Sequence, residues 1–254
     1  IIHSHYYRKP EVVTGKVVLV FGGGPSGIDI SCDMSPYASK IYFSHHRPDL
    51  LQCNFPKNIN HMPNVIEFTN DGVIFEDNTF FEIDFVLLCT GYKLSFPFLS
   101  QECGVVVKED KYVECFYKHL ILVWKSTLCI VGLVSHTFLF PLFDFQVRFF
   151  LKVLSGCVQL PSIDKMLEDI EEEFKEKLKN GFKRKNFHQL GSGREKLYLD
   201  SLAELAQIQR LPPVIFRIYK NVCENRIRFF ESYRDYNYTI IDDVSYTCNG
   251  ILIN

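Results

Sequence analysis

The amino-acid sequence predicts an α/β fold in which a parallel sheet carries the first part of the chain. A continuous apolar run, Val17–Phe21, leads directly into a cluster of glycines, and a second run, Lys40–Ser44, follows after a helix-length interval. Apolar runs of this kind are typical of parallel strands that are buried on both faces. Residues 28–34 are expected to form the connecting helix, and Ser35-Pro36 to end it.

Length and composition indicate an ordinary globular chain. It has 254 residues, of which 47% are hydrophobic, and a formal net charge of −2. That length suits one large or two modest domains. Because the charge is close to zero, the chain has no electrostatic footprint for nucleic acid, and we expect no nucleic-acid partner.

The cysteines and the most apolar segment bear on the compartment. Nine cysteines are scattered without a C-x-x-C pair, which indicates neither a disulfide framework nor a zinc site. A reducing compartment is the simpler interpretation, so the cytoplasm is expected, with endoplasmic reticulum association and secretion left open. Residues 120–143 are interrupted by Lys125, His136 and Pro141, which predicts a buried core segment and no membrane span.

The glycines after the first strand are spaced as Gly22-x-Gly24-x-x-Gly27. In a βαβ unit the first glycine permits a tight turn, the second lets the backbone approach a pyrophosphate, and the third lets the helix pack on the strand. The N-terminus of that helix favours an anion, and the hydroxyl of Ser26 can add a donor. A glycine-rich loop without a ligand is the alternative, and the strand–helix–strand context favours the dinucleotide site.

The end of the second strand indicates which dinucleotide is bound. An NAD site normally places Asp or Glu there, whereas this chain has Ser44-His45-His46-Arg47 and no carboxylate before Asp49. A hydroxyl and a guanidinium suit a 2′-phosphate, so Ser44 and Arg47 predict NADP over NAD. The alternative for Arg47 is an ordinary surface arginine, and for His45 and His46 a structural role is the favoured interpretation.

Two later segments have clear patterns without chemistry of their own. Residues 64–92 contain three short strand candidates with turns at 70–72 and 77–78, followed by the apolar run 85–89. Residues 164–179 have helical spacing, with Ser162 as N-cap and Gly181 as the stop. The apolar positions of this helix are expected core contacts: Met166, Leu167, Ile170, Phe174 and Leu178.

Several polar residues of the second half are interpreted as structural. The acidic run at residues 168–174 is expected to be a solvated face rather than a metal site. His119, His136 and His188 have no ligand spacing. We therefore assign no metal ligand in this chain.

Taken together and in order, the motifs resemble those of the flavin-containing monooxygenases. His3 and Tyr7 match the second half of the signature F-x-G-x-x-x-H-x-x-x-Y/F. The NADPH fingerprint of the family matches Gly22, Gly24, Ser26 and Gly27, and its A/C-T-G-Y element, which links the NADPH and FAD domains, matches residues 89–92. Further similar segments cover nearly the whole chain: 96–99, 128–133, 140–149, 160–162 and 198–205.

The resemblance implies an α/β protein with a Rossmann-like NADPH-binding domain and the second half of an FAD-binding domain. The expected boundaries are 1–13 for the end of the first FAD segment and linker, 14–84 for the NADPH-binding domain, and 85–254 for the rest of the FAD domain with a helical tail. It adds Thr90, Gly91, Tyr92 and Gln146 as cofactor-binding residues, Gln146 matching a glutamine near the flavin. The family's first glycine fingerprint has no counterpart here, so the chain is expected to be a C-terminal fragment.

The function implied by the resemblance is a monooxygenase that uses NADPH, FAD and O₂. Reduced flavin would form a C4a-hydroperoxide, which oxidises the soft amine nitrogen or sulfide sulfur of a small molecule. No catalytic side chain is assigned, and activity of the fragment alone stays open. The alternatives are a truncated, noncatalytic NADP-binding protein and a pyridine nucleotide-disulfide reductase, and the latter needs a redox cysteine pair that is not visible here.

Overall fold

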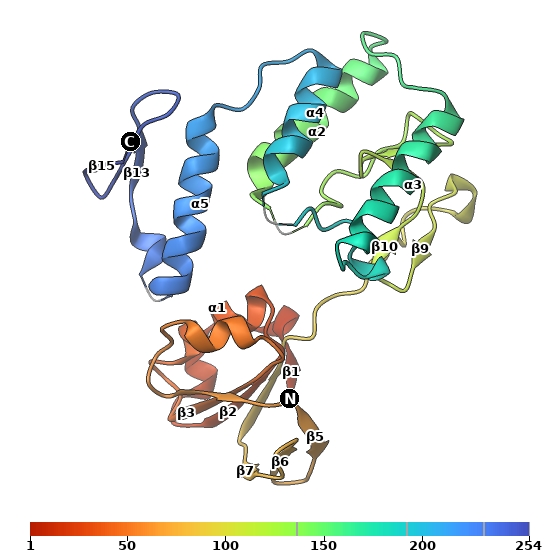
Figure 1. Ribbon diagram of the computed structural model, residues 1–254. Coiled ribbons are helices and arrows are strands. Elements are labelled where there is room, and N and C mark those ends of the chain that lie inside the picture. The colour runs from red at the N-terminus through yellow and green to blue at the C-terminus, as the bar shows by residue number, and fades with distance from the viewer. Residues whose placement is uncertain (136, 192, 231, 254) are drawn as a thin grey trace. The chain divides into compact units, whose positions relative to one another are not determined.

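The computed structural model describes residues 1–135, 137–191, 193–230 and 232–253, and the chain divides into two compact units (Figure 1). Unit 1 contains Ile1–Gly91 and Arg217–Asn254, and unit 2 contains Tyr92–Phe216. The expected α/β class is confirmed, since unit 1 contains a parallel sheet with a connecting helix. Among the histidines considered above, His136 lies outside the described residues.

The centre of unit 1 is a five-stranded sheet in which every neighbouring pair is parallel. Its strands, in spatial order, are β1 (Ile2–His3), β8 (Phe85–Leu88), β2 (Val17–Phe21), β3 (Lys40–Ser44) and β4 (Ile59–Met62). The two strands predicted from apolar runs are confirmed at the expected bounds. Parallel strands buried on both faces explain why these runs do not alternate with polar residues.

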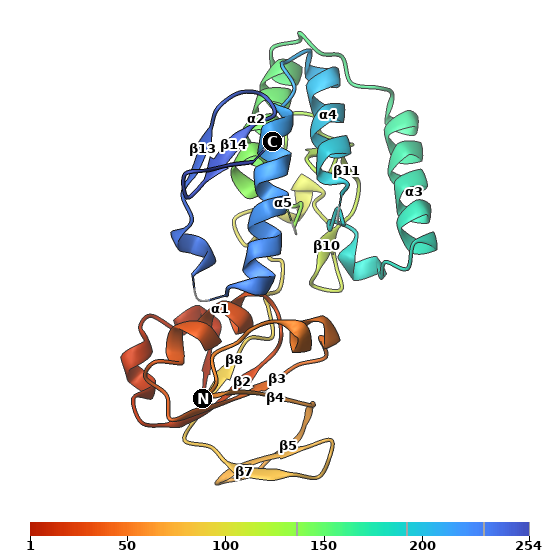
Figure 2. The same ribbon diagram turned by 60° about the vertical axis from the view of Figure 1, so that its left-hand side comes forward.

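The side chains of the central strands divide unit 1 into three layers. Val18 and Val20 of β2 face helix α1 (Pro25–Met34), whereas Leu19 between them packs against Phe75. Phe75 belongs to a small antiparallel sheet, which lies on the other side of the parallel sheet from α1 (Figure 2). That sheet contains the three short strands expected after residue 64: β5 (Val65–Phe68), β6 (Gly72–Phe75) and β7 (Phe80–Glu82).

The sheet extends beyond the domain boundaries expected from the sequence. Strand β8 pairs with β2 and also with β1, where Ile2 lies opposite Leu87 and His3 opposite Leu88. Residues 1–13 and 85–91 therefore share a unit with the glycine turn, which the expected boundaries of 14–84 did not include.

The C-terminal segment also contributes to unit 1. Helix α5 (Pro213–Arg228) leads into a three-stranded antiparallel sheet formed by β13 (Tyr238–Ile240), β14 (Tyr246–Cys248) and β15 (Ile251–Ile253). The guanidinium of Arg234 lies 2.9 Å from Asp29 of α1, and the rings of Phe230 and Phe55 stack with centroids 4.6 Å apart. These contacts hold the C-terminal segment against the first ninety residues.

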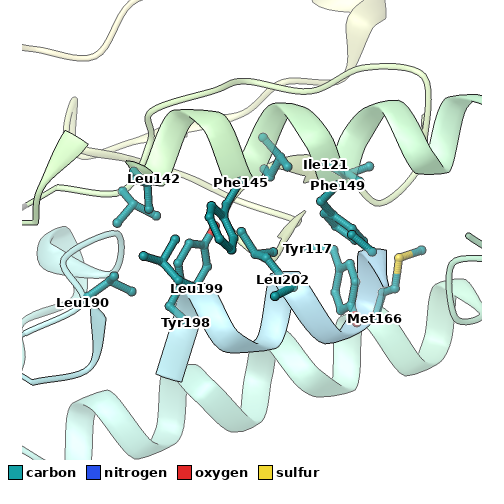
Figure 3. Close-up of a cluster of buried hydrophobic side chains, with 14 of the residues drawn as sticks. Tyr117, Ile121, Leu142, Phe145, Phe149, Met166, Leu190, Tyr198, Leu199 and Leu202 are labelled. Atoms are coloured by element: carbon teal, nitrogen blue, oxygen red, sulfur yellow. The ribbon is translucent and has the colours of Figure 1, made fainter. Parts of the chain in front are cut away.

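The described part of unit 2 contains three whole α-helices and two short hairpins, and most of its buried apolar side chains form one hydrophobic core. Its elements are β9 (Val107–Lys108), β10 (Tyr112–Val113), β11 (Phe116–Tyr117), β12 (Ile121–Leu122), α2 (Leu139–Leu154), α3 (Ile163–Lys179) and α4 (Glu195–Ala206). Phe145 of α2 and Leu202 of α4 point toward one another in this core (Figure 3). Residues 120–143 include β12 and the first residues of α2, which are separated by a long connection. No helix of the described ranges is both long and apolar enough to cross a membrane.

Helix α3 confirms the predicted helix and its cap. The backbone N–H of Lys165 donates to the Oγ of Ser162 at 3.3 Å, as expected for an N-cap. Met166 is buried in the core of unit 2, whereas Leu178 is 43% exposed. The core contact expected for Leu178 is therefore wrong, because the apolar stripe ends one turn earlier.

Candidate dinucleotide-binding site

Two glycines of the turn between β2 and α1 are required by the backbone itself. Gly22 has a φ of +115°, and a Cβ there would lie 2.5 Å from the carbonyl oxygen of Cys89. A Cβ at Gly27 would lie 1.9 Å from the carbonyl oxygen of Gly22. Neither position accepts a side chain, as a tight turn and close helix–strand packing require.

The middle glycine of the turn differs from its neighbours. Gly24 is the N-cap of α1 with an ordinary φ of −76°, and no atom lies within 4 Å of a Cβ built there. The space beside Gly24 is therefore open. The first N–H groups of a helix have no intrahelical partner, so the backbone at Ser26 and Gly27 can donate into this space.

Arg47 reaches back to the glycine turn from the loop after β3. Its Nη1 lies 3.5 Å from the carbonyl oxygen of Gly23, and its Nε donates to Oδ1 of Asp49 at 2.7 Å. The Nη2 donates to the other carboxylate oxygen, so the pair is bidentate. The hydrogen bond from Arg47 holds the pKa of Asp49 below its usual value. A permanently charged guanidinium therefore stands next to the turn.

Ser44 does not present its hydroxyl to the turn. The residue has no exposed surface, and its Oγ donates to the carbonyl oxygen of Pro63 at 2.7 Å. The phosphate contact predicted for this hydroxyl is therefore wrong. The carbonyl oxygen of Ser44 instead accepts the N–H of Gly22 at 2.9 Å, which ties the glycine turn to the end of β3.

Two histidines meet at the ends of the next two strands. The Nε2 of His45 and the Nδ1 of His61 are 2.7 Å apart, and the backbone N–H of Arg47 donates to the Nδ1 of His45 at 3.1 Å. His45, Arg47 and His61 line a cavity of about 450 Å³, together with His46, Pro48, Leu51, Met62 and Pro63. His61 carries no signal in the sequence, because residues 59–62 have too short an apolar pattern to predict a strand.

The C-T-G-Y element lies where unit 1 passes into unit 2. Gly91 has a φ of +84° and its carbonyl oxygen is 3.1 Å from the Nε2 of His3. The Nδ1 of His3 accepts the N–H of His5, so its Nε2 carries the proton and donates to Gly91. Two motifs that are 88 residues apart thus meet in unit 1. Thr90 is exposed and the ring of Tyr92 is 55% exposed, and their cofactor contacts stay predictions.

Gln146 lies inside unit 2. Its Oε1 accepts the N–H of Gly132 at 2.9 Å, and its Nε2 donates to the hydroxyl of Tyr198 at 2.8 Å. The side chain is completely buried on α2. Gln146 therefore joins the Gly132 loop to α4, and its contact with a flavin stays a prediction.

A second polar cluster, the histidine–glutamate network, lies in unit 2 and consists of His119, His188, Glu173 and Lys177. The N–H of Val113 donates to Nε2 of His188, the two histidine Nδ1 atoms are 3.0 Å apart, and Nε2 of His119 lies 2.9 Å from Glu173. Nε2 of His188 also lies 3.2 Å from the carbonyl oxygen of Val113. Burial lowers the pKa of both histidines, so both rings are neutral. Since Glu173 can only accept, Nε2 of His119 then donates to it, and Nδ1 of His188 donates to Nδ1 of His119.

The same network corrects the interpretation of the acidic run. Glu173 also forms a 2.9 Å ion pair with Lys177, whose Nζ donates to the carbonyl oxygen of Phe187 at 2.6 Å. Burial raises the pKa of Glu173, but the hydrogen bond from His119 and the charge of Lys177 outweigh it and bring the pKa below its usual range. Glu173 is thus bound into the network and only partly solvated, with 34% of its side chain exposed, whereas Glu171 and Glu172 are exposed.

Comparison with known proteins gives the family. A family model described as flavin-binding monooxygenase-like matches residues 1–51 and 48–243. This chain belongs to that family. The predicted resemblance to flavin-containing monooxygenases is thereby confirmed.

Individual relatives of the monooxygenase-like family agree with this assignment. Senecionine N-oxygenase from Tyria jacobaeae is 32% identical over 96% of this chain and 54% of its own length. A flavin-containing monooxygenase from Arabidopsis thaliana, named GS-OX-like 9, is 30% identical over 92% of this chain and 52% of its own length. The solved structure of S-allyl-L-cysteine S-oxygenase from Allium sativum is 30% identical, with a TM-score of 0.83, over 92% of this chain and 54% of that chain. The chain thus spans about half the length of these relatives.

Proposed function

We propose that this chain binds NADP(H). We also propose that, within a whole enzyme that uses NADPH, FAD and O₂, it supports the oxygenation of a soft nitrogen or sulfur atom of a small molecule. The observation that carries the proposal is the glycine turn. Gly22 and Gly27 are closed to any side chain, whereas Gly24 faces open space at the N-terminus of α1. Two closed positions on either side of an open one, at the start of a helix that follows a parallel strand, are the arrangement that a dinucleotide-binding turn requires.

The residues around the turn fit a phosphorylated dinucleotide. The open space beside Gly24 admits a pyrophosphate, and the N–H groups of Ser26 and Gly27 are available to bind it. The guanidinium of Arg47 is the nearby positive charge that suits a 2′-phosphate. These residues bind and orient the dinucleotide and neutralise its charge, and none of them takes up or releases a proton in doing so.

The flavin and the substrate class rest on the family. A bound flavin would supply the oxygen-transfer chemistry, and the chain supports its site through the fold of unit 2. One relative is named an N-oxygenase and one solved neighbour an S-oxygenase. These names support an amine nitrogen or a sulfide sulfur as the oxygenated atom.

Two glycine variants separate an effect on NADP(H) binding from an effect on the stability of the fold. Gly24→Ala adds a methyl group into open space at the N-cap of α1, where Ala is a poorer cap than Gly, so the free energy of unfolding should change by about 1 kcal/mol or less. The affinity for NADP⁺ should nevertheless fall by about tenfold or more, because the methyl group takes the place of the phosphate. Gly27→Ala should lose both stability and binding, because its Cβ overlaps the backbone of Gly22. Titration calorimetry gives the affinities.

Ser39→Ala is the matched control, since Ser39 is exposed just before β3, at the end of the strand opposite Ser44. It should leave both stability and affinity unchanged. Normal NADP⁺ affinity in Gly24→Ala would contradict the proposed site.

A second measurement separates the monooxygenase from a noncatalytic NADP-binding protein. Flavin absorbance in the purified protein, together with NADPH-dependent O₂ consumption that an added amine or sulfide stimulates, supports the monooxygenase. NADPH binding without flavin and without O₂ consumption supports the alternative.

A further inference from the structure

The loop after β3 packs directly against the glycine turn. A Cβ at Gly23 would lie 2.7 Å from Cβ of His45 and 3.2 Å from Cγ of Arg47. His45 and Arg47 are thus the side chains that cover this part of the turn. Any shift of His45 therefore changes the position from which the side chain of Arg47 extends.

The hydrogen bonds around His45 allow only one arrangement of protons. The backbone N–H of Arg47 can only donate, so Nδ1 of His45 carries no proton. A neutral ring then has its proton on Nε2, which donates to Nδ1 of His61 over 2.7 Å. His61 in turn carries its proton on Nε2. The N–H of Arg47 therefore fixes the tautomer of His45, and His45 in turn fixes that of His61.

The position of His61 is set by the sheet and by aromatic packing. His61 lies opposite Phe43 in the parallel register of β3 and β4, and its ring meets that of Phe55 with centroids 4.9 Å apart. The rings of His45 and Phe43 are also in edge contact, with centroids 4.6 Å apart. Burial lowers the pKa of His45 to about 4 and also lowers the pKa of His61, so both rings are neutral near pH 7.

We propose that His45 is a positioning residue for cofactor choice: it holds the backbone of Arg47 so that the guanidinium meets a 2′-phosphate, and His61 fixes the tautomer that makes this possible. The inference rests on the proposed NADP(H) site. It adds that the preference for NADP over NAD depends on two uncharged histidines beside the guanidinium of Arg47.

The hydrogen bond from the backbone N–H of Arg47 to Nδ1 of His45 suggests two substitutions that separate the role of the acceptor from that of the ring. An acceptor on residue 45 that binds the N–H of residue 47 has the geometry of an Asx turn, which the Oδ1 of asparagine forms readily. His45→Asn therefore keeps the acceptor and loses the ring. His45→Phe keeps a ring against Phe43 and Gly23 and loses the acceptor.

The affinities of the 254-residue chain for NADP⁺ and NAD⁺ test the proposal, measured by titration calorimetry. His45→Phe should weaken NADP⁺ binding about five- to tenfold, the loss expected for one hydrogen bond, and change NAD⁺ binding less than about twofold. His45→Asn should stay within about twofold of the unsubstituted chain for both. His46→Asn, at the exposed neighbouring position, is the control.

Two results would overturn the proposal: equal losses of NADP⁺ affinity in His45→Phe and His45→Asn, or equal losses of NADP⁺ and NAD⁺ affinity in His45→Phe. Failure of the unsubstituted chain to bind either nucleotide would instead contradict the proposed function.

The imidazole ¹⁵N shifts of the unsubstituted chain test the proton arrangement without any ligand. We expect both His45 and His61 to carry the proton on Nε2, and a proton on Nδ1 of His45 would overturn the positioning role.

Discussion

The glycine turn of unit 1 and the histidine–glutamate network of unit 2 are built in opposite ways. The turn comes from six consecutive residues, and its middle glycine faces open space. In the network, three of the hydrogen-bonded pairs are 54, 69 and 75 residues apart in the sequence, and Glu173 is the one member with substantial exposure. The turn leaves the N–H groups of Ser26 and Gly27 for a ligand, whereas the donors of the network are used within the protein.

This difference predicts that the turn determines nucleotide affinity and that the network determines the stability of unit 2. Buried polar groups that satisfy one another make a fold specific, and removing one of them leaves the others without partners. Backbone N–H groups at an open helix N-terminus contribute little until an anion arrives. We therefore expect changes in the network to alter the stability of unit 2, and changes near the turn to alter nucleotide affinity.

Removal of Glu173 should have the largest effect. Glu173→Ala leaves the ammonium of Lys177 buried without its counter-ion and the Nε2–H of His119 without an acceptor. Breaking a buried pair in this way costs roughly 3–5 kcal/mol. The only tryptophan, Trp124, lies in unit 2, so its fluorescence during urea denaturation reports on this unit.

Glu172→Ala, an exposed neighbour on α3, is the matched control and should change the free energy of unfolding by less than about 0.5 kcal/mol. NADP⁺ affinity should stay normal in a folded sample of either variant. Equal stability of the two variants would mean that the network does not support unit 2.

Acidification should weaken unit 2 next. Burial lowers the pKa of His119 and lowers that of His188 to about 3, so the folded state binds fewer protons than the unfolded state below pH 6.5. Stability is then present above pH 6.5 and lost as the pH falls toward 3. For His188 the loss reaches about 2 kcal/mol by pH 5, from the unfolded pKa of about 6.5, and His119 adds to it in the same direction. The depressed pKa of Glu173 acts in the same direction at lower pH.

The free energy of unfolding, followed by Trp124 fluorescence between pH 7 and 5, measures this loss. In His188→Asn the slope should fall by about one proton, because the side chain no longer titrates. An unchanged slope would show that His188 is already charged in the folded state.

Arg47→Ala should have a smaller effect, confined to unit 1. Loss of the guanidinium removes the charged partner of the 2′-phosphate, so the dissociation constant for NADPH should rise roughly tenfold, as for one charge-assisted hydrogen bond. The dissociation constant for NADH should change little. Equal increases for both nucleotides would contradict the assignment of Arg47 to the phosphate.

Elements that rest on local pattern could be predicted from the sequence. Strands β2 and β3 follow from uninterrupted apolar runs, and α3 follows from helical spacing and the Ser162 cap. The glycine turn could be predicted because its requirements belong to the backbone, where Gly22 and Gly27 leave no room for a Cβ.

Side-chain partners from other strands could not be predicted in the same way. The partner of Ser44 is the carbonyl of Pro63, and the partner of His45 is His61, so both depend on the register of β4, a strand without a clear pattern. In α3 a signal was present, since Lys177 lies one turn after Glu173 and beside the apolar stripe. Periodicity placed the pair on the helix without giving its distant partner His119.

The smallest effect that we expect is at Asp49, and it can sharpen the assignment of unit 1. The carboxylate of Asp49 occupies both Nε and Nη2 of Arg47, so a 2′-phosphate must compete with it for the guanidinium. The pair is half exposed, and such pairs contribute less than about 1 kcal/mol. Asp49→Asn should therefore raise NADPH affinity by up to about fivefold. NADH affinity should stay the same or fall, since a carboxylate near this strand end is the group that binds ribose hydroxyls in NAD sites. A loss of NADPH affinity would instead mean that Asp49 orients Arg47 for the phosphate, and the competition between carboxylate and phosphate would be excluded.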